Sequence, residues 1–213
     1  MYFEYDEKSI DYLKIKDPIL GKAIDIIGRI ERPVQADLYE SLVNSIVGQQ
    51  ISTAAHKTIW KRIQDFYGEV TPQKICSTPL ENLQKFGISF RKAEYILENS
   101  QKVLTGELDI KALKTKGDEE IIKELSALKG IGIWTAEMLM IFCMQRPNIV
   151  SYGDLAILRG MRMLYRHRKI DKKLFAKYQR RYSPYGSLAS LYLWAIAGGA
   201  IPDLKDPAPK NKK

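Results

Sequence analysis

Residues 128–136 read Leu-Lys-Gly-Ile-Gly-Ile-Trp-Thr-Ala and lie between two segments with helical character. Gly130 and Gly132 flank one apolar residue, so the backbone can turn sharply with positive φ where a side chain would clash. The turn exposes peptide N–H groups at the start of the next helix, where unsatisfied donors and the helix dipole favour an anion. The pattern predicts a hairpin that binds nucleic-acid phosphate, with Lys129 adding a positive charge.

A second candidate, Asp154, stands 18 positions after Ala136 in the tripeptide Gly-Asp-Leu at 153–155, and a basic helix follows it. Aspartate is a favoured N-cap, so one role for Asp154 is to cap the helix that begins at Leu155. A carboxylate in a basic region also weakens the attraction of DNA, so an inert aspartate there is unexpected. The residue types alone leave both a capping role and a catalytic role open.

The charge balance indicates a polyanionic partner. The chain of 213 residues has a formal net charge of +9, and 45% hydrophobic residues are enough for a core. The segment 159–181 holds ten basic side chains against Asp171 alone. The alternative interpretation of this run is a solvated helix face, which is the usual role of such runs.

Several classes of protein are disfavoured. Cys76 and Cys143 are too few and too far apart for a disulfide framework, a four-cysteine cluster or a zinc ribbon. His56 and His167 have no neighbouring ligands at metal-binding spacing, so we expect no metal site and no cofactor. No apolar run approaches the ~20 residues of a membrane span. The N-terminus lacks the order of a signal peptide, so we expect a soluble, cytoplasmic protein, associated with the nucleoid if bacterial.

Apolar spacing and capping residues predict an all-α fold of about ten helices. Helix starts are marked by Asp37, by Ser52, by Thr71 and Thr78 before prolines, and by Ser89. The expected helices cover roughly 38–48, 52–67, two short segments after Pro72 and Pro79, 90–104, 118–127, 134–144, 154–166, 172–182 and 186–197. No repeat or linker divides the chain, so we expect one domain over 1–205 and a disordered basic tail over 206–213.

The order and spacing of these motifs resemble the helix-hairpin-helix (HhH-GPD) DNA glycosylases, and most of all the 3-methyladenine DNA glycosylase II type, over about residues 17–199. The resemblance implies an all-helical, two-lobed protein with the active site in the cleft between the lobes. It also implies that a monomer binds double-stranded DNA with a damaged base and flips the damaged nucleotide. The segments that carry it are 48–52 (Gly-Gln-Gln-Ile-Ser), 87–89 followed by Lys92-Ala93, 128–136, 153–155 and Trp194.

The resemblance gives Asp154 the catalytic role, and the chemistry is consistent with it. Breaking a nucleobase–sugar bond develops positive charge at C1′, which a carboxylate can stabilise while it orients or deprotonates water. A base that is N-alkylated and already cationic leaves without much protonation. One carboxylate is then sufficient.

Trp134 stands where relatives that also cut the DNA backbone carry a lysine nucleophile. An indole cannot supply that amine, so the resemblance implies a monofunctional enzyme that leaves an abasic site. The aromatic face can instead stack on the extruded base, with Met138 one turn further and Tyr152 lining the same pocket. A core tryptophan between two helices is the alternative.

The resemblance also assigns DNA contacts. It implies that the side chain of Gln50 fills the gap left by the flipped base and that Gln49 contacts DNA nearby. A polar helix–helix loop is the alternative, and Ser52 is either a DNA contact or the cap of its helix. In the hairpin, the expected DNA-binding residues are Lys129, Gly130, Gly132 and Thr135.

Three functions therefore stay open at this point. The first is release of alkylated purines such as 3-methyladenine in base excision repair. The second is release of deaminated or oxidised bases, since the pocket side chains do not separate the two. The third is a non-catalytic HhH module that recognises distorted duplex, and Asp154 argues against it.

Overall fold

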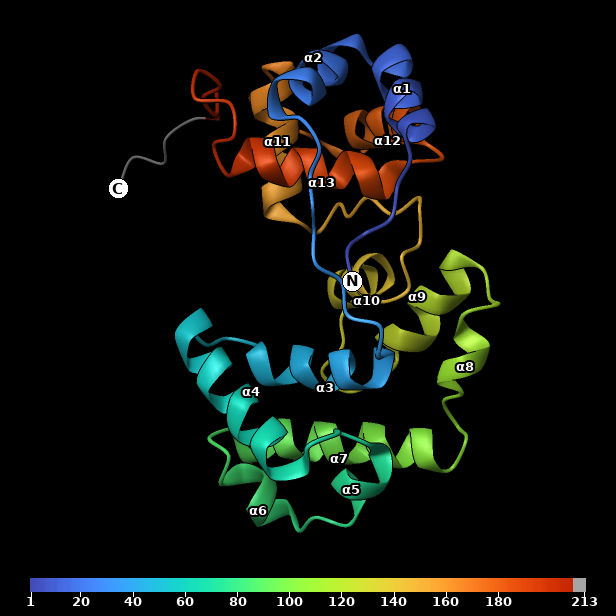
Figure 1. Cartoon of the computed structure of the whole chain (residues 1–213), viewed down its shortest axis with the longest axis vertical. Helices are drawn as coiled ribbons and strands as arrows, with labels where there is room; N and C mark the ends of the chain where they lie inside the picture. The colour runs from blue at the N-terminus through green and yellow to red at the C-terminus, as the bar shows by residue number, and fades with distance from the viewer. Residues whose placement is uncertain (209–213) are drawn as a thin grey trace. The chain divides into compact units, whose positions relative to one another are not determined.

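A computed structural model describes residues 1–208 of the chain. Within them the regular structure consists of 13 helices and an isolated antiparallel bridge between Tyr2 and Pro33 (Figure 1). The predicted all-α fold class is therefore confirmed. The chain forms two compact units, of which unit 2 is Gln35–Leu139 and unit 1 combines Met1–Val34 with the chain from Met140 onward.

Unit 2 is organised around one long helix, α7 (Phe90–Leu104), which packs against α3, α5 and α6. Its buried face is built from Ala93, Ile96, Asn99 and Ser100, so two polar residues lie on an otherwise apolar stripe. The other helices of the unit are α3 (Leu38–Gly48), α4 (Thr53–Tyr67), α5 (Pro72–Cys76), α6 (Leu80–Gln84), α8 (Ile110–Leu113) and α9 (Asp118–Ser126).

Unit 1 is organised around α13 (Gly186–Ala197), whose residues are buried along most of its length. Its closest partner is α11 (Leu155–Tyr165), and a Cβ at Gly160 of α11 would lie 2.2 Å from the Leu193 carbonyl oxygen. Only glycine allows this approach. The unit also contains α1 (Glu7–Lys16), α2 (Pro18–Ile27) and α12 (Lys172–Tyr182), and α10 (Ile133–Phe142) runs from unit 2 into unit 1.

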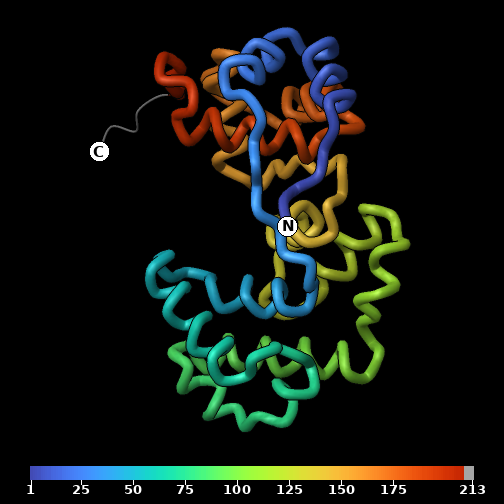
Figure 2. The backbone as a smooth tube through the Cα atoms, in the orientation of Figure 1, coloured from blue at the N-terminus to red at the C-terminus, as the bar shows by residue number. Residues whose placement is uncertain are grey.

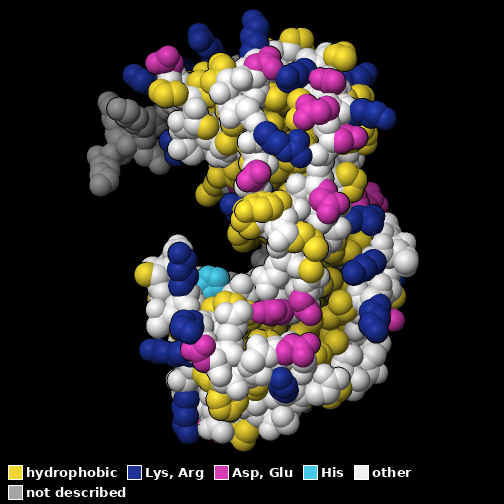
Figure 3. All heavy atoms as spheres, in the orientation of Figure 1, with side chains coloured by type: hydrophobic (Ala, Val, Ile, Leu, Met, Phe, Trp, Pro, Cys, Tyr) yellow, Lys and Arg dark blue, Asp and Glu magenta, His cyan; other side chains and the backbone are white. Residues whose placement is uncertain are grey.

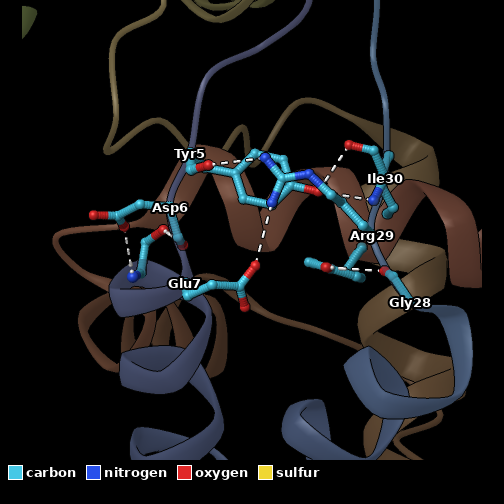
Figure 4. A network of polar contacts seen from close by, with 8 residues as sticks. Tyr5, Asp6, Glu7, Gly28, Arg29 and Ile30 are labelled. Atoms are coloured by element: carbon cyan, nitrogen blue, oxygen red, sulfur yellow. Dashed lines mark hydrogen bonds and ion pairs between the residues drawn. The ribbon is translucent and has the colours of Figure 1, made fainter.

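The N-terminal segment runs antiparallel to the segment after α2, as the tube in Figure 2 shows. The Phe3 N–H donates to the Arg32 carbonyl at 2.8 Å. The Tyr5 hydroxyl donates to the Ile30 carbonyl at 2.8 Å and accepts from the Ile30 N–H at 2.7 Å. Figure 4 shows Arg29 reaching both the Tyr5 carbonyl and the Glu7 carboxylate. These contacts fix the start of the chain on unit 1.

Most of the helix starts predicted from capping residues are confirmed. Asp37, Ser52, Thr71 and Ser89 each accept a backbone N–H in the first turn of the helix that follows. The prediction for Thr78 is wrong in detail, because α6 has Pro79 as its N-cap and no side-chain cap. The Thr78 hydroxyl instead accepts from the Tyr67 hydroxyl and donates to the Lys74 carbonyl.

Three helices are additional to those expected, namely α1, α2 and α8. Each begins with an aspartate whose carboxylate accepts backbone N–H groups: Asp6 before α1, Asp17 before α2 and Asp109 before α8. Asp17 also precedes a proline at the first helical position. The signal was therefore present in the sequence.

The expected tail starts at Asp206, which is held to unit 1. Its carboxylate accepts from the Arg162 Nε at 2.9 Å and from the Ala208 N–H at 3.1 Å. The rest of the predicted tail, residues 209–213, lies outside the described residues. Over residues 1–208, no helix is both long enough and apolar enough to cross a membrane.

The Asp206–Arg162 pair predicts an acid-sensitive contribution to stability. The hydrogen bond from Arg162 lowers the pKa of Asp206 below its ordinary 3.8. The contribution is therefore present above pH 3.8 and is lost as the pH falls through the lowered pKa. We expect Asp206→Asn to lower the melting temperature at pH 7 by about 2–4 °C, equivalent to about 1 kcal/mol for a chain of this size.

Thermal melts of both proteins from pH 7 to pH 2.5 measure this difference. It should narrow as the pH falls below 3.8 and close once the pH is below the lowered pKa of Asp206, where the parent carboxylate is protonated and carries no charge, like the asparagine of the variant. Asp203→Asn, an exposed position on the same segment, is the control. A difference that is independent of pH would contradict the assignment.

Candidate nucleic-acid interface

The hairpin between α9 and α10 depends on Gly130, whose φ is 80°. A Cβ there would also lie 2.7 Å from Cδ2 of Tyr95, so no other residue fits without movement. The prediction of positive φ at both glycines is wrong for Gly132, which is not in the left-handed region. Gly132 lies at the start of α10, where its carbonyl accepts the Ala136 N–H, and a Cβ there would meet nothing within 4 Å.

Two consecutive hairpin carbonyls are held by side chains from elsewhere in unit 2. Asn99 of α7 donates from Nδ2 to the Lys129 carbonyl at 2.9 Å. Gln49 donates from Nε2 to the Gly130 carbonyl at 2.6 Å. Peptide groups are planar, so binding these oxygens fixes the orientation of the adjoining peptides. Gln49, predicted to contact DNA, thus joins the α3–α4 turn to the hairpin.

A polar concavity of about 400 Å³ lies where the α3–α4 turn meets the hairpin. Gln50 is exposed there and has a φ of 55°, a conformation that L residues rarely adopt. Ser52 caps α4 by accepting the Ala55 N–H at 3.2 Å, which confirms the capping alternative. The lining includes Gln49, Gln50, Arg91, Lys92, Tyr95 and Gly132. The structure thus brings the predicted Gln49–Gln50 turn and the predicted hairpin glycines to one surface.

The charge expected at Lys129 is partly neutralised. Its ammonium lies 2.9 Å from the Glu98 carboxylate of α7, and this hydrogen bond raises the pKa of Lys129. The side chain is more than half exposed, so a phosphate can compete for it. Lys92, which lines the concavity, has a lowered pKa because burial removes water from its ammonium.

Trp134 lies in the first turn of α10 and exposes 49% of its surface. The alternative of a core tryptophan is therefore wrong. Thr135 and Met138 are intermediate in exposure, whereas Ala136 of the same helix is buried. About half of the indole surface is thus presented to solvent at the start of this helix.

Asp154 is the N-cap of α11 and is only 6% exposed. Its Oδ1 accepts the N–H groups of Ala156 and Ile157, both at 2.9 Å. The capping role is therefore confirmed. These two bonds fix the orientation of the carboxylate, and the partial positive charge of the helix start favours a negative group there.

The segment leading to Asp154 is anchored by serines of α13. Ser187 accepts the Ile149 N–H at 2.9 Å, and Ser190 donates to the Ile149 carbonyl at 3.0 Å. Next in the chain, the Tyr152 ring packs edge-on against Phe175 of α12, with ring centroids 5.1 Å apart. Tyr152, predicted to line the base pocket, thus contacts α12 in unit 1.

The basic segment 159–181 is partly satisfied within unit 1. Arg162 and Arg159 approach the Asp206 carboxylate, and Arg181 lies 3.0 Å from the buried Asp17 carboxylate. Exposed cations of this segment include Arg166, Arg168, Lys169, Lys172, Lys173, Lys177 and Arg180. Figure 3 shows Lys and Arg side chains also along the edge of unit 2 formed by α4, where Lys57, Lys61 and Arg62 are exposed.

Both histidines have hydrogen-bond partners inside their units. The His56 Nε2 lies 2.6 Å from the Asn44 Oδ1, and the His167 Nε2 lies 2.7 Å from the Tyr178 hydroxyl. In the part of the chain that the structure describes, no group of three or more His, Cys, Asp or Glu side chains could hold a metal ion. Each histidine is thus held by a residue of its own unit.

Comparison with known proteins decides the family. The sequence pattern of the family described as "HhH-GPD superfamily base excision DNA repair protein" matches residues 43–184. The chain belongs to this superfamily. The match covers the α3–α4 turn, the hairpin and Asp154, and of the segments that carry the sequence resemblance only Trp194 lies outside it.

Solved structures agree with this assignment. A DNA-3-methyladenine glycosidase from Bacillus halodurans has 35% sequence identity and a TM-score of 0.87, with 95% of each chain covered. A 3-methyladenine DNA glycosylase from Schizosaccharomyces pombe, solved in complex with abasic DNA, has 28% identity and a TM-score of 0.76, with 88% of this chain and 95% of that chain covered. The Bacillus subtilis protein YfjP is 29% identical over 169 residues, which are 74% of this chain and 58% of YfjP. The chain therefore spans little more than half of YfjP.

The contribution of α7 to this interface was not predicted from the sequence. Lys92 and Asn99 bind carbonyls of the α3–α4 turn and of the hairpin, and Arg91 packs over the Tyr95 ring. Asn99 gave a usable signal, because an amide on an apolar helix stripe needs a hydrogen-bond partner when buried. Lys92 gave a weaker one, since lysine at the start of a helix is usually exposed.

The two hairpin glycines predict contrasting effects of alanine. Gly130→Ala forces an L residue into positive φ and against Tyr95, so we expect a loss of about 1–3 kcal/mol in the free energy of unfolding. Gly132→Ala meets nothing within 4 Å, so we expect a stability loss below about 1 kcal/mol. Its new methyl group should instead obstruct a phosphate at the start of α10.

Denaturant melts and DNA-binding titrations separate these effects. Gly132→Ala should weaken binding to all duplexes alike, with or without a lesion, because phosphate contacts carry no base information. Weakening confined to one lesion type would contradict a backbone contact at Gly132.

Proposed function

We propose that this protein is a monofunctional DNA glycosylase of base excision repair, which hydrolyses the N-glycosidic bond of alkylated purines such as 3-methyladenine and leaves an abasic site. The observation that carries the proposal is the Asp154 carboxylate, which two N–H groups hold rigidly at the start of α11. Membership of the HhH-GPD superfamily supports the reaction class, and the two solved glycosylases support the substrate class.

In the proposed reaction the C1′–N bond breaks, and the base leaves with the electron pair of that bond. The Asp154 carboxylate stabilises the positive charge that develops at C1′ and orients the water whose oxygen then bonds to C1′. The proton lost by the water passes to the carboxylate or to solvent. An N-alkylated purine carries a positive charge before the reaction and leaves as a neutral base, so no acid is needed to protonate it.

The proposed role of Trp134 follows from its exposed position at the start of α10. Its indole stacks on the extruded base and attracts a cationic purine through its π-face, worth ~0.5–2 kcal/mol. An indole forms no Schiff base with the sugar. Lys129, the nearest hairpin amine in sequence, has Glu98 as its partner, and a protonated amine is no nucleophile.

The proposed partner is double-stranded DNA with a damaged base, bound by a monomer in the cytoplasm. The exposed cations and the glycine hairpin support DNA binding, because phosphate neutralisation dominates such affinity. The partner of the S. pombe relative in its solved structure is abasic DNA. The chain has only two cysteines, Cys76 and Cys143, and this low number is consistent with a reducing compartment.

The direct test is incubation of the purified protein with duplexes that each carry one defined lesion: an alkylated purine, a deaminated base or an oxidised base. We expect release of the alkylated purine in the presence of EDTA and without nucleotide. The DNA strand should stay intact until alkali cleaves it at the abasic site. Borohydride, which reduces a Schiff base to a permanent bond, should trap no protein–DNA complex.

Each arm can contradict a different part of the proposal. Release of only deaminated or oxidised bases would contradict the proposed substrate class, and release of no base would indicate a DNA-binding module. A trapped complex, or cleavage without alkali, would show that an amine reaches C1′.

The catalytic role of Asp154 predicts that binding and turnover separate in Asp154→Asn. Asparagine caps helices as well as aspartate does, so α11 should be retained. Loss of the charge should lower the single-turnover rate of base release by about 100-fold or more. DNA binding should stay equal or become tighter, because the carboxylate repels phosphate.

Asp171→Asn is the matched control, since Asp171 caps α12 in the same unit by accepting the Leu174 N–H at 2.8 Å. It should release base at the parent rate. A parent-like rate in Asp154→Asn would leave Asp154 with the capping role alone.

A further inference from the structure

One face of α7 binds both loops of the candidate interface in unit 2. Lys92, Tyr95 and Asn99 are spaced by three and four residues and therefore lie along one face of the helix. Lys92 reaches the α3–α4 turn, and Asn99 reaches the hairpin. Tyr95 packs against Gly130 between them. The two loops thus share a single support.

Lys92 binds the end of α3 in an unusual way. Its Nζ donates to the Val47 carbonyl at 2.9 Å and to the Gln49 carbonyl at 2.6 Å. These oxygens lie at the negative end of the helix dipole, so a cation there is favourable. Burial also costs free energy, and it lowers the pKa of Lys92. A helix end in water needs no such cation, because water satisfies its carbonyls.

The consequence of this contact is the path of the chain after α3. Gln49 is extended, with φ −62° and ψ 136°, and Gln50 then adopts a φ of 55°. The left-handed conformation of an L residue costs about 1–2 kcal/mol. Surrounding contacts must therefore hold it. The bond from Lys92 to the Gln49 carbonyl fixes the peptide that joins these two residues.

The Gln49 side chain completes the connection. Its Nε2 donates to the Gly130 carbonyl at 2.6 Å, so the residue held by Lys92 also holds the hairpin. Asn99 binds the neighbouring Lys129 carbonyl from α7 itself. Gln50 and the hairpin are therefore kept at a fixed spacing by hydrogen bonds within unit 2.

We propose that Lys92 is a positioning residue for DNA binding. Through the Gln49 peptide it fixes Gln50 relative to the hairpin, so that both loops are already ordered when they engage a damaged duplex. This inference rests on the proposed function. A loop ordered before binding loses no conformational freedom on binding, which increases affinity. The effect of Lys92 should therefore be expressed through Gln50.

The experiment is a double-mutant cycle of Lys92→Met and Gln50→Ala, with affinity measured for a duplex that contains a tetrahydrofuran abasic-site analogue. Methionine retains an unbranched side chain and removes the three N–H donors. Each single variant should lower the affinity about tenfold. The double variant should lose little more than either single variant, because residues that act through one another are not additive.

Two further variants control for a merely structural role. Lys102→Met makes the same change on the same helix, where the ammonium pairs with Glu107, and it should retain parent affinity. Lys92→Arg keeps a donor for the α3 carbonyls and should recover part of the lost affinity. If Lys92→Met fails to fold in a circular dichroism melt, Gln49→Met replaces it in the cycle. That variant removes the bond to Gly130 and should show the same non-additivity.

Additive losses, an unchanged affinity in the Lys92 and Gln49 variants, or a parent protein that does not bind the abasic duplex would overturn the inference. The cycle measures binding without base release, so its outcome is distinguishable from that of the proposed function. Normal base release with additive binding losses would contradict only the positioning role of Lys92. Non-additive binding losses without release of any base would support that role and contradict the glycosylase activity.

Discussion

Every helix leaves four N–H groups at its start and four carbonyls at its end without partners inside the helix, and this constraint shapes most of the protein. A chain of many short helices has to satisfy such groups repeatedly. Asp17 shows how: its Oδ1 accepts the N–H groups of Ile19 and Leu20, and its Oδ2 accepts from the Tyr165 hydroxyl and from Arg181. One fully buried carboxylate thus caps the start of α2 and joins this helix to α11 and α12.

The same constraint produces the features that suit DNA binding. In unit 2 the carbonyls at the end of α3 are bound by Lys92, and those of the hairpin are bound by Asn99 and Gln49. The carbonyl side of each loop is thereby anchored to protein. Donors at a helix start are suited to an anion, and Gly132 places no side chain over them. The interface follows from how the helix ends are satisfied.

The sequence was most informative where the deciding contact is local. Caps such as Asp37 and Ser89 bond to residues three positions away, so helix starts could be predicted from the residues alone. Contacts between distant segments could not: Gln49 bonds to Gly130, 81 positions away, so its role as a link between the two loops could not be predicted. Thr78 is a residue type that often caps helices, but its hydroxyl oxygen accepts a hydrogen bond from the Tyr67 hydroxyl instead. The close approach of Tyr95 to Gly130 is likewise a contact between distant segments.

Asp154 is the position where local and distant effects have to be weighed. A helix cap does not require burial, since Asp37 and Asp171 cap their helices from exposed positions. Asp154 is by contrast only 6% exposed, although burying a carboxylate costs free energy. The proposed chemistry makes use of this burial. A fixed charge shielded from water interacts more strongly with a developing cation, and it needs no reorganisation during the reaction. In the proposed reaction the cap holds the carboxylate in place, and its burial strengthens the field that acts on the sugar.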